Sequence, residues 1–405
     1  MESSQPPPAA SSWSDLPRDT ILEILLRVPA KDLCRLRAVS PSWRALTCDP
    51  RFIADHKSRH TAPLLAVAYR DQDMANGVDV VDLSGNVVRR IPSIESDILT
   101  TDKSGNVYPL IRTSEDSIRV VRTHLDLICF TRQYHPLGIW VLNPATGATL
   151  VLPKEHSEEL ARDDDVKRNY GRGQMESCAL GQVSSTGEYK LIRISSVRDR
   201  QLCEVITLDG ANYGSWRGKK SPPSPICAGP GEAMKCVVIG GVVHFLMNFY
   251  SGYCNTGVMT IEPGSIASFN LATEEWMATL RGPSPVRTFV QDNKGFIYAD
   301  LTLQLSLAEL DGSLVTVQNI HYISIDLWLL TDVENGIWEK KYNIPSHVAQ
   351  LFVYPFLVLN DGRILFSHGE KYVTSYDPKT GTYVYALEVR DSRSIGIYTG
   401  SLLSL

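Results

Sequence analysis

The sequence predicts a mainly β protein with a small helical module at its N-terminus. Between residue 14 and about residue 60 the apolar residues recur at helical spacing. From residue 63 onward they alternate in short runs that turn residues separate, as in strands. The same strand–turn–strand pattern returns at intervals of about sixty residues, which is typical of a repeat fold such as a β-propeller. The chain has 405 residues, enough for a small domain and a large one.

The helical segment contains start signals for three or four short helices. Pro17 stands at a first helical turn, where its missing N–H costs nothing. Ser40-Pro41 and Asp49-Pro50 each combine an N-cap residue with a proline at the first helical position. The first helix has one apolar face, formed at positions i, i+3, i+4 and i+7 by Ile21, Ile24, Leu25 and Val28.

Such a short helical unit buries only a small part of its surface and is marginally stable alone. Its apolar residues are therefore expected to serve two surfaces. One is an internal core, and the other is a face that binds a partner.

The order, spacing and type of these residues resemble an F-box over about forty positions. The matching stretches are Leu16-Pro17-x-Asp19-x-Ile21-Leu22-Glu23-Ile24-Leu25-x-Arg27-Val28-Pro29, Leu33-x-x-Leu36-Arg37-x-Val39-Ser40-x-x-Trp43-Arg44 and Asp49-Pro50-x-Phe52. We therefore expect an F-box at residues 13–60, after a Ser/Pro/Ala-rich disordered tail at residues 1–12. Ala38 stands where the family often has Cys, and Pro41 stands where Lys is common; neither change alters the expected docking surface.

The resemblance implies that this module docks onto the Skp adaptor of a Skp–cullin–F-box ubiquitin ligase. Interfaces of this stable kind are apolar, so a leucine-rich helical face suits the role. Some of the candidate residues will belong to the internal core instead. The candidates are Leu16, Pro17, Ile21, Ile24, Leu25, Leu33, Leu36, Val39 and Trp43.

The β-rich part repeats a hairpin in which an Asp or Asn follows a strand and starts a turn. These anchors are Asp82, Asn143, Asp209, Asn270, Asp332 and Asp377, at steps of 61, 66, 61, 62 and 45 residues. Asp, Asn and Gly supply the turn, and a large aromatic residue after it is expected to cover the neighbouring blade.

The phrases from Ile266 through Trp276 and from Ile325 through Trp338 resemble the F-box-associated, kelch-like β-propellers of large plant F-box families. We therefore expect a propeller of about six blades at residues 61–405. The last blade would be closed by a strand near residues 64–70 or by Ile395 to Leu403. An open array of two-sheet sandwiches is the alternative architecture.

Known catalytic and metal-binding motifs are missing from the sequence. It has no phosphate-binding loop, nucleophile elbow or zinc-protease motif, and its eight cysteines form no C-x-x-C pair. We read His244 as a packed core histidine and Asp163-Asp164-Asp165 as a solvated charged loop. No catalytic residue, cofactor or metal is therefore expected.

The resemblance implies a non-catalytic substrate receptor. It would bind the Skp adaptor, reach the cullin and RING subunits through it, and select an unidentified target protein. The net charge of −5 does not favour nucleic acid as a partner, and the longest apolar run, residues 237–250, is too short to span a membrane. We expect the protein in the cytoplasm, the nucleus or both. The alternatives are an F-box role outside ubiquitination and an enzyme built on the propeller.

Overall fold

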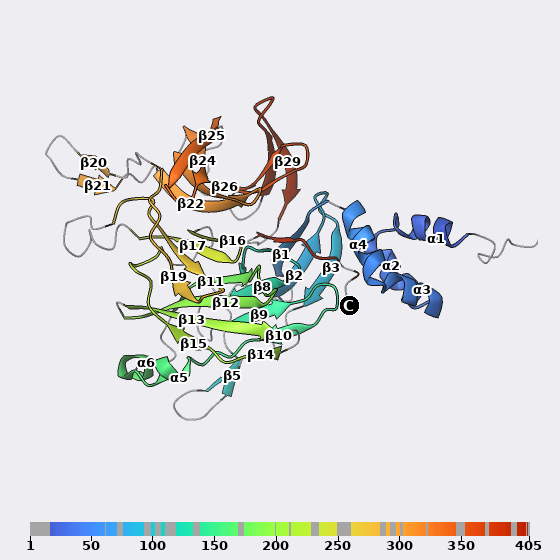
Figure 1. Ribbon diagram of the computed structural model, residues 1–405, viewed down its shortest axis with the longest axis horizontal. Helices are drawn as coiled ribbons and strands as arrows, with labels where there is room; N and C mark the ends of the chain where they lie inside the picture. The colour runs from blue at the N-terminus through green and yellow to red at the C-terminus, as the bar shows by residue number, and fades with distance from the viewer. Residues whose placement is uncertain are drawn as a thin grey trace, which may run out of the picture. The chain divides into compact units, whose positions relative to one another are not determined.

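The chain folds into two compact units (Figure 1). The helical unit consists of Met1–Ala62 together with Gly400–Leu405, and the propeller consists of Pro63–Thr399. We predicted that the propeller extends to residue 405, but Gly400–Leu405 group with the helices instead. The predicted tail at residues 1–12 lies outside the described residues. The computed structural model describes residues 17–60, 62–70, 76–92, 99–101, 107–109, 119–132, 138–168, 174–198, 200–209, 212–227, 235–248, 261–283, 289–291, 297–299, 303–320, 323–345, 353–368, 372–389, 395–401 and 403.

The described part of the helical unit forms four short helices, which confirms the sequence prediction. They are α1 (Arg18–Leu25), α2 (Ala30–Leu36), α3 (Pro41–Thr47) and α4 (Pro50–Arg59). Pro17 is the N-cap of α1 and stands just before the first turn, one position earlier than predicted. The Asp49 carboxylate caps α4 by accepting a hydrogen bond of 2.8 Å from the backbone N–H of Arg51.

Six sheets of the described residues form the blades of the propeller, as predicted, and all their strand pairs are antiparallel except β30 with β7. Blade 1 holds β1 (Leu64–Arg70), β2 (Asn76–Val81) and β3 (Val87–Pro92), joined by β30 (Ile395–Tyr398) and β7 (His124–Leu125). Blade 2 holds β6 (Arg119–Val120), β8 (Ile128–Arg132), β9 (Gly138–Leu142) and β10 (Thr149–Val151). Blade 3 holds β11 (Gln174–Gln182), β12 (Tyr189–Val197), β13 (Arg200–Asp209), β14 (Asn212–Tyr213) and β15 (Arg217–Lys219).

The remaining blades follow in chain order. Blade 4 holds β16 (Cys236–Ile239), β17 (Val242–Leu246), β18 (Ile266–Asn270) and β19 (Glu275–Trp276). Blade 5 holds β22 (Leu303–Leu310), β23 (Ser313–Ile320), β24 (Ser324–Asp332) and β25 (Ile337–Pro345). Blade 6 holds β26 (Val353–Val358), β27 (Ile364–His368), β28 (Tyr372–Asp377) and β29 (Thr382–Glu388). Two further hairpins, β4 (Leu99–Thr101) with β5 (Val107–Pro109) and β20 (Phe289–Gln291) with β21 (Ile297–Ala299), stand outside these sheets.

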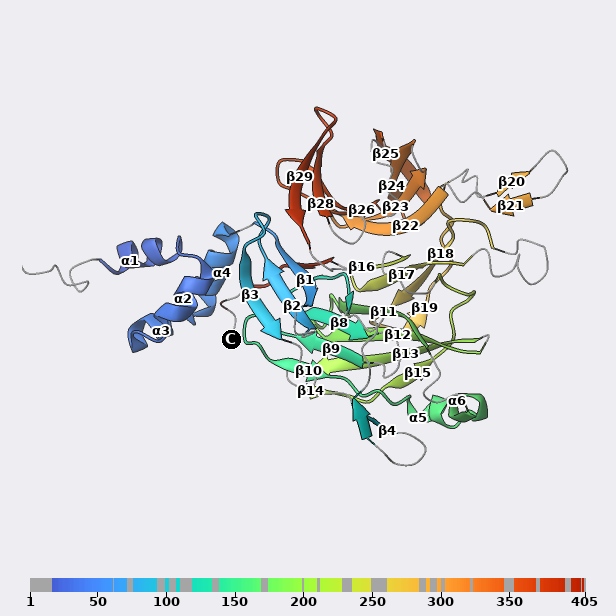
Figure 2. The same ribbon diagram turned by 180° about the vertical axis from the view of Figure 1, so that it is seen from behind.

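The first blade closes the ring by using both ends of the propeller chain. Leu64 of β1 pairs with Tyr398 of β30, and β30 in turn pairs in parallel with β7. The prediction that one of these two strands closes the last blade is wrong, because blade 6 has its own four strands, β26 to β29. The two strands pair with each other in blade 1 instead. Figure 2 shows blade 1 in blue beside blade 2 in cyan, and the buried residues of blade 6 pack against those of blade 1. Closure buries a face of blade 6 against a face of blade 1, both of which an open array would leave exposed.

The predicted turn anchors close the hairpin between the third and fourth strands of the blades. The Oδ1 atoms of Asp82, Asn143, Asn270 and Asp377 each accept a backbone N–H two residues further on, at 2.8 or 2.9 Å. The Oδ1 of Asp332 accepts the N–H of Asn335 at 3.0 Å. A short polar side chain that bonds its own turn is therefore the feature that recurs along the sequence.

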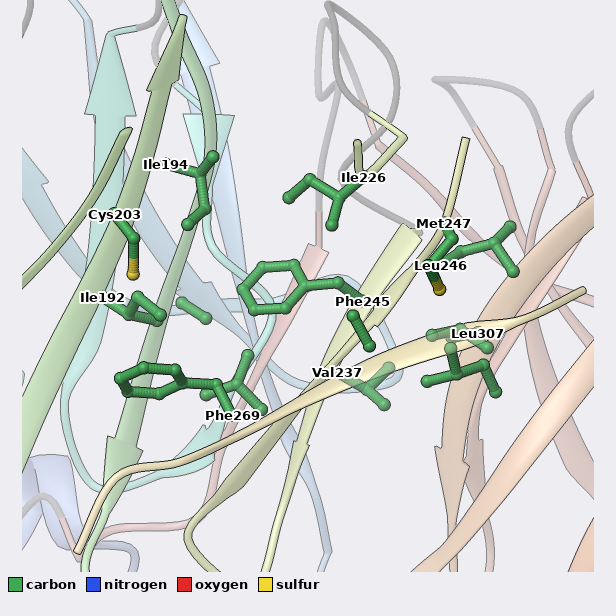
Figure 3. Packing of buried hydrophobic residues seen from close by; sticks show 14 of the residues in the cluster. Ile192, Ile194, Cys203, Ile226, Val237, Phe245, Leu246, Met247, Phe269 and Leu307 are labelled. Carbon is green, nitrogen blue, oxygen red and sulfur yellow. The ribbon is translucent and has the colours of Figure 1, made fainter. Parts of the chain in front are cut away.

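Buried apolar side chains fill the spaces between successive blades. Figure 3 shows Phe245 of β17 and Phe269 of β18 pointing toward Ile192 of β12, with Leu307 of β22 on the other side of the cluster. This cluster joins blades 3, 4 and 5. It contains most of the apolar run from Val237 to Leu246. Two strands occupy the run, because Gly240 and Gly241 form a turn with φ of 57° and 80°.

The large aromatic residue predicted after the turn is a tryptophan in three blades, and its indole N–H forms the same kind of hydrogen bond each time. Trp216, Trp276 and Trp338 each donate their Nε1–H to a backbone carbonyl of the preceding part of the chain, and each distance is 2.8 Å. The acceptors are the carbonyl oxygens of Pro153, Lys220 and Arg281. Each Trp therefore packs as an apolar group and also satisfies a carbonyl from the preceding connection.

We expect Trp276→Phe to lower the free energy of unfolding by about 1 kcal/mol, since it removes one hydrogen bond and keeps an aromatic ring against Phe245 and Phe269. Trp328→Phe is the matched control, because the buried Nε1 of Trp328 has no acceptor among the described residues. Urea denaturation of the two variants measures the difference. Equal losses in both would show that the indole hydrogen bond does not contribute.

A network of buried charges joins the connection after blade 2 to blade 3. Glu204 of β13 is fully buried and accepts hydrogen bonds from the His156 Nδ1 at 2.9 Å, the Ser157 backbone N–H at 2.6 Å and the Arg193 Nε at 2.8 Å. The Arg193 guanidinium also lies 3.9 Å from the centre of the Trp216 ring. Every oxygen of the buried carboxylate thus has a donor.

The charged segment that follows is solvated, as predicted, with the Asp164 side chain 81% exposed, but it is helical and not a loop. It forms two short helices, α5 (Glu158–Ala161) and α6 (Asp164–Arg168). The Oδ1 of Asp163 accepts the backbone N–H of Asp165 at 2.8 Å, and its Oδ2 accepts from Arg200 at 2.6 Å. Val166 is buried beside Val197 and Leu202. Capping and this small apolar cluster order the segment.

Candidate functional site

The helical unit divides the predicted adaptor-binding residues between its core and its surface. Leu25 and Leu33 are buried in the core, together with Leu26, Phe52 and Leu403. Leu33 has no exposed surface at all. These two predicted residues therefore hold the unit together and are not free to contact a partner.

A second group remains accessible. Ile24 is 41% exposed and Val39 is 73% exposed, and they are the exposed large apolar side chains among the described residues of this unit. Pro17 is also exposed. Ile21, Leu36 and Trp43 are half-buried and pack against the core, so each offers one side outward. Leu16 lies outside the described residues.

Polar contacts at the end of α1 hold this helix against α4. The Arg59 guanidinium donates to both carboxylate oxygens of Glu23, at 2.6 and 2.8 Å, and this bond keeps the pKa of Glu23 below its ordinary value. The Nε2 of His56 lies 2.9 Å from the Val28 carbonyl oxygen, and the Nε2 of His60 lies 3.1 Å from that of Leu26. Two imidazoles thus satisfy carbonyls that the end of a helix leaves unpaired.

The propeller carries a groove of about 730 Å³ between blades 4 and 5. Its lining is mostly apolar, and Met277 and Val333 are exposed on it. A few polar groups, among them His244, Ser268 and Arg281, interrupt the apolar surface, which is the usual character of a binding groove. Its apolar lining consists of Ile239, Val242, Met277, Ala278, Leu280, Leu314, Leu330 and Val333.

His244 lies in the wall of this groove. Its Nδ1 is 2.9 Å from the Ser268 Oγ, and burial lowers the pKa of the imidazole to about 4. The ring is therefore neutral at physiological pH. Among the described residues, no group of three or more His, Cys, Asp or Glu side chains could hold a metal ion, and no helix is long and apolar enough to cross a membrane.

Comparison with known families matches both units. Residues 13–55 match the F-box domain, and residues 101–390 match the F-box associated beta propeller domain. The second match alone covers more than half of the chain. The chain belongs to the F-box-associated β-propeller family. In this F-box protein, the F-box match overlaps the four helices, and the propeller match covers most strands of the blades.

Curated relatives of this F-box protein come from Arabidopsis thaliana. The F-box/kelch-repeat protein At4g19930 is 24% identical over 395 residues, which cover 91% of this chain and 81% of the relative. The F-box/kelch-repeat protein At3g23880 is 22% identical and covers 96% of both chains. Among solved structures, a lectin of Aleuria aurantia covers 82% of this chain and 96% of its own at 10% identity and a TM-score of 0.39, a likeness too distant to bear on function.

The sequence did not predict two features of this F-box protein. Leu403 belongs to the F-box core, although it lies 351 positions after Phe52 along the chain. The groove between blades 4 and 5 draws its walls from several turns and strands of both blades. No local pattern marks either feature, because each arises from contacts between distant segments.

Proposed function

We propose that this F-box protein is the substrate-recognition subunit of a Skp–cullin–F-box ubiquitin ligase. The F-box would bind the Skp adaptor through its exposed apolar side chains, and the propeller would bind the target protein. Its place of action would be the cytoplasm, the nucleus or both. The observation that carries the proposal is a compact F-box that leaves Ile24 and Val39 exposed after its own core is complete.

The role requires no catalytic residue in this chain. A receptor that holds the target near the charged ubiquitin carrier raises the effective concentration of the target lysine. The remaining exposed apolar surface of the F-box suits a stable protein interface, since such interfaces have apolar cores. These features support an adaptor that acts by proximity.

Co-expression of the full chain with a Skp adaptor tests the first step. We expect a one-to-one complex that stays together in size-exclusion chromatography and that then binds a cullin–RING assembly. Elution of the folded F-box protein separately from the adaptor would contradict the proposal. Formation of the adaptor complex without binding of the cullin–RING assembly would instead indicate a role outside ubiquitination.

A further inference from the structure

Leu403 is built into the F-box, far from the helices along the chain. It has no exposed surface, and its side chain belongs to the same core cluster as Leu25, Leu26, Leu33 and Phe52. All other buried members of this cluster come from residues 25–52, so Leu403 completes a core that the helices begin.

The backbone of Leu403 is held as well. The Nη2 of Arg37 donates to the Leu403 carbonyl oxygen at 2.8 Å and to the Thr47 carbonyl oxygen at 2.7 Å. The Arg37 Nε donates to the Thr47 Oγ1 at 3.2 Å, and Thr47 is fully buried. The Leu403 N–H donates to the Ser401 Oγ at 3.2 Å. One guanidinium therefore joins α2, α3 and Leu403.

The topology of blade 1 delivers Leu403 to the F-box. Leu64, which starts β1, pairs with Tyr398, which ends β30. The first strand after the helices and the last strand before Leu403 are therefore neighbours in one sheet. Leu403 follows Tyr398 by only five positions along the chain. A short tether of this kind keeps a high effective concentration of Leu403 near its site in the F-box.

The F-box is a small unit, so each buried side chain is a large share of its core. Removal of Leu403 would open a cavity in the core that Leu25 and Leu33 share. Ile24 lies beside Leu25 on α1, and Val39 lies in the turn that follows α2. The shape of the exposed face thus depends on a residue that lies far from it along the chain.

We propose that Leu403 is a structural element of the F-box, and that its docking into the F-box core controls adaptor binding. The F-box core accommodates the apolar side chain of Leu403, and Arg37 binds the Leu403 carbonyl oxygen. The link to the adaptor rests on the function proposed above. Because such coupling is reciprocal, a bound adaptor must in turn hold Leu403 more firmly in its site.

Hydrogen exchange of the full-length protein tests the structural part without an adaptor. In Leu403→Asp we expect the amides of α1 to α4 to exchange at least tenfold faster than in the wild type, while those of β12 and β13 keep their rates. Leu403→Met is the matched control, because it keeps an apolar side chain of similar volume and should exchange like the wild type. Unchanged exchange in Leu403→Asp would overturn the proposal.

Binding to a purified Skp adaptor tests the coupling. We expect at least a tenfold higher dissociation constant for Leu403→Asp, an intermediate value for Leu403→Ala and a wild-type value for Leu403→Met. Equal affinities for all four proteins would overturn the coupling. If the wild type itself did not bind an adaptor, the proposed function would fail, while the exchange rates would still decide whether Leu403 supports the F-box.

Discussion

The double variant Ile24→Asp/Val39→Asp is expected to bind the Skp adaptor at least about 100-fold more weakly than the wild type. Burying one aliphatic side chain of this size is worth about 1.5–3 kcal/mol, and about 1.4 kcal/mol corresponds to a factor of ten in affinity. Removing two such side chains from the interface therefore accounts for the expected factor. A carboxylate placed in an apolar interface adds a desolvation cost.

The same variant should keep its fold, because both side chains are exposed in the free protein. Val384→Asp is a matched control: Val384 is 53% exposed, lies on β29 and is remote in sequence from the F-box. Isothermal titration with the purified adaptor measures the affinities, and a thermal melt verifies folding. Wild-type affinity in the double variant would show that the adaptor binds elsewhere.

We expect a different result for those predicted adaptor-binding residues that are buried. Leu25 and Leu33 lie in the F-box core, so truncating them would weaken adaptor binding only through loss of the fold. The sequence pattern selects all nine residues alike, because an F-box needs apolar residues on both surfaces. Burial in the folded unit separates the two roles.

The second large effect concerns the buried carboxylate of the propeller. Glu204→Ala should lower the free energy of unfolding by about 3–5 kcal/mol, because it leaves the buried Arg193 without its counter-charge. The Ser157 N–H and the His156 imidazole would lose their acceptor as well. Urea denaturation followed by tryptophan fluorescence measures the change, since Trp216 stacks on Arg193.

Glu339→Ala is the control for this substitution, because Glu339 is an exposed glutamate on β25 and its removal should change stability little. The double variant Glu204→Met/Arg193→Met should recover part of the loss, since apolar residues of similar size can replace a buried ion pair. A loss in Glu204→Ala no larger than that in Glu339→Ala would contradict the role of the network.

The pH dependence of stability follows from the same contacts. Burial alone would raise the pKa of Glu204, but the hydrogen bond from His156, the Arg193 charge and the Ser157 N–H together lower it to about 2. Because the pKa in the folded state is below the unfolded value of about 4.5, this stabilisation is complete above pH 4.5 and is lost as the pH falls toward 2. The stability difference between the wild type and Glu204→Gln should therefore shrink over that interval.

Local chemistry explains why much of the fold can be predicted. Helical spacing and N-cap signals predict the four helices, and the anchors from Asp82 to Asp377 predict one hairpin per blade. The hairpin that pairs Arg193 with Glu204 was not predicted, because its turn starts at Arg198, whose φ of 55° is unusual for a residue other than glycine. Without that turn, the register that brings the two charges together cannot be derived.

The sequence alone determined the class of this protein, since an F-box and a recurring hairpin depend on residues that are close together along the chain. Only the tertiary structure decided how the two ends of the chain are used. It pairs Leu64 with Tyr398 to close the ring and places Leu403 in the F-box core. These contacts join segments more than 300 residues apart, and their stability comes from burial and backbone pairing that no local pattern records.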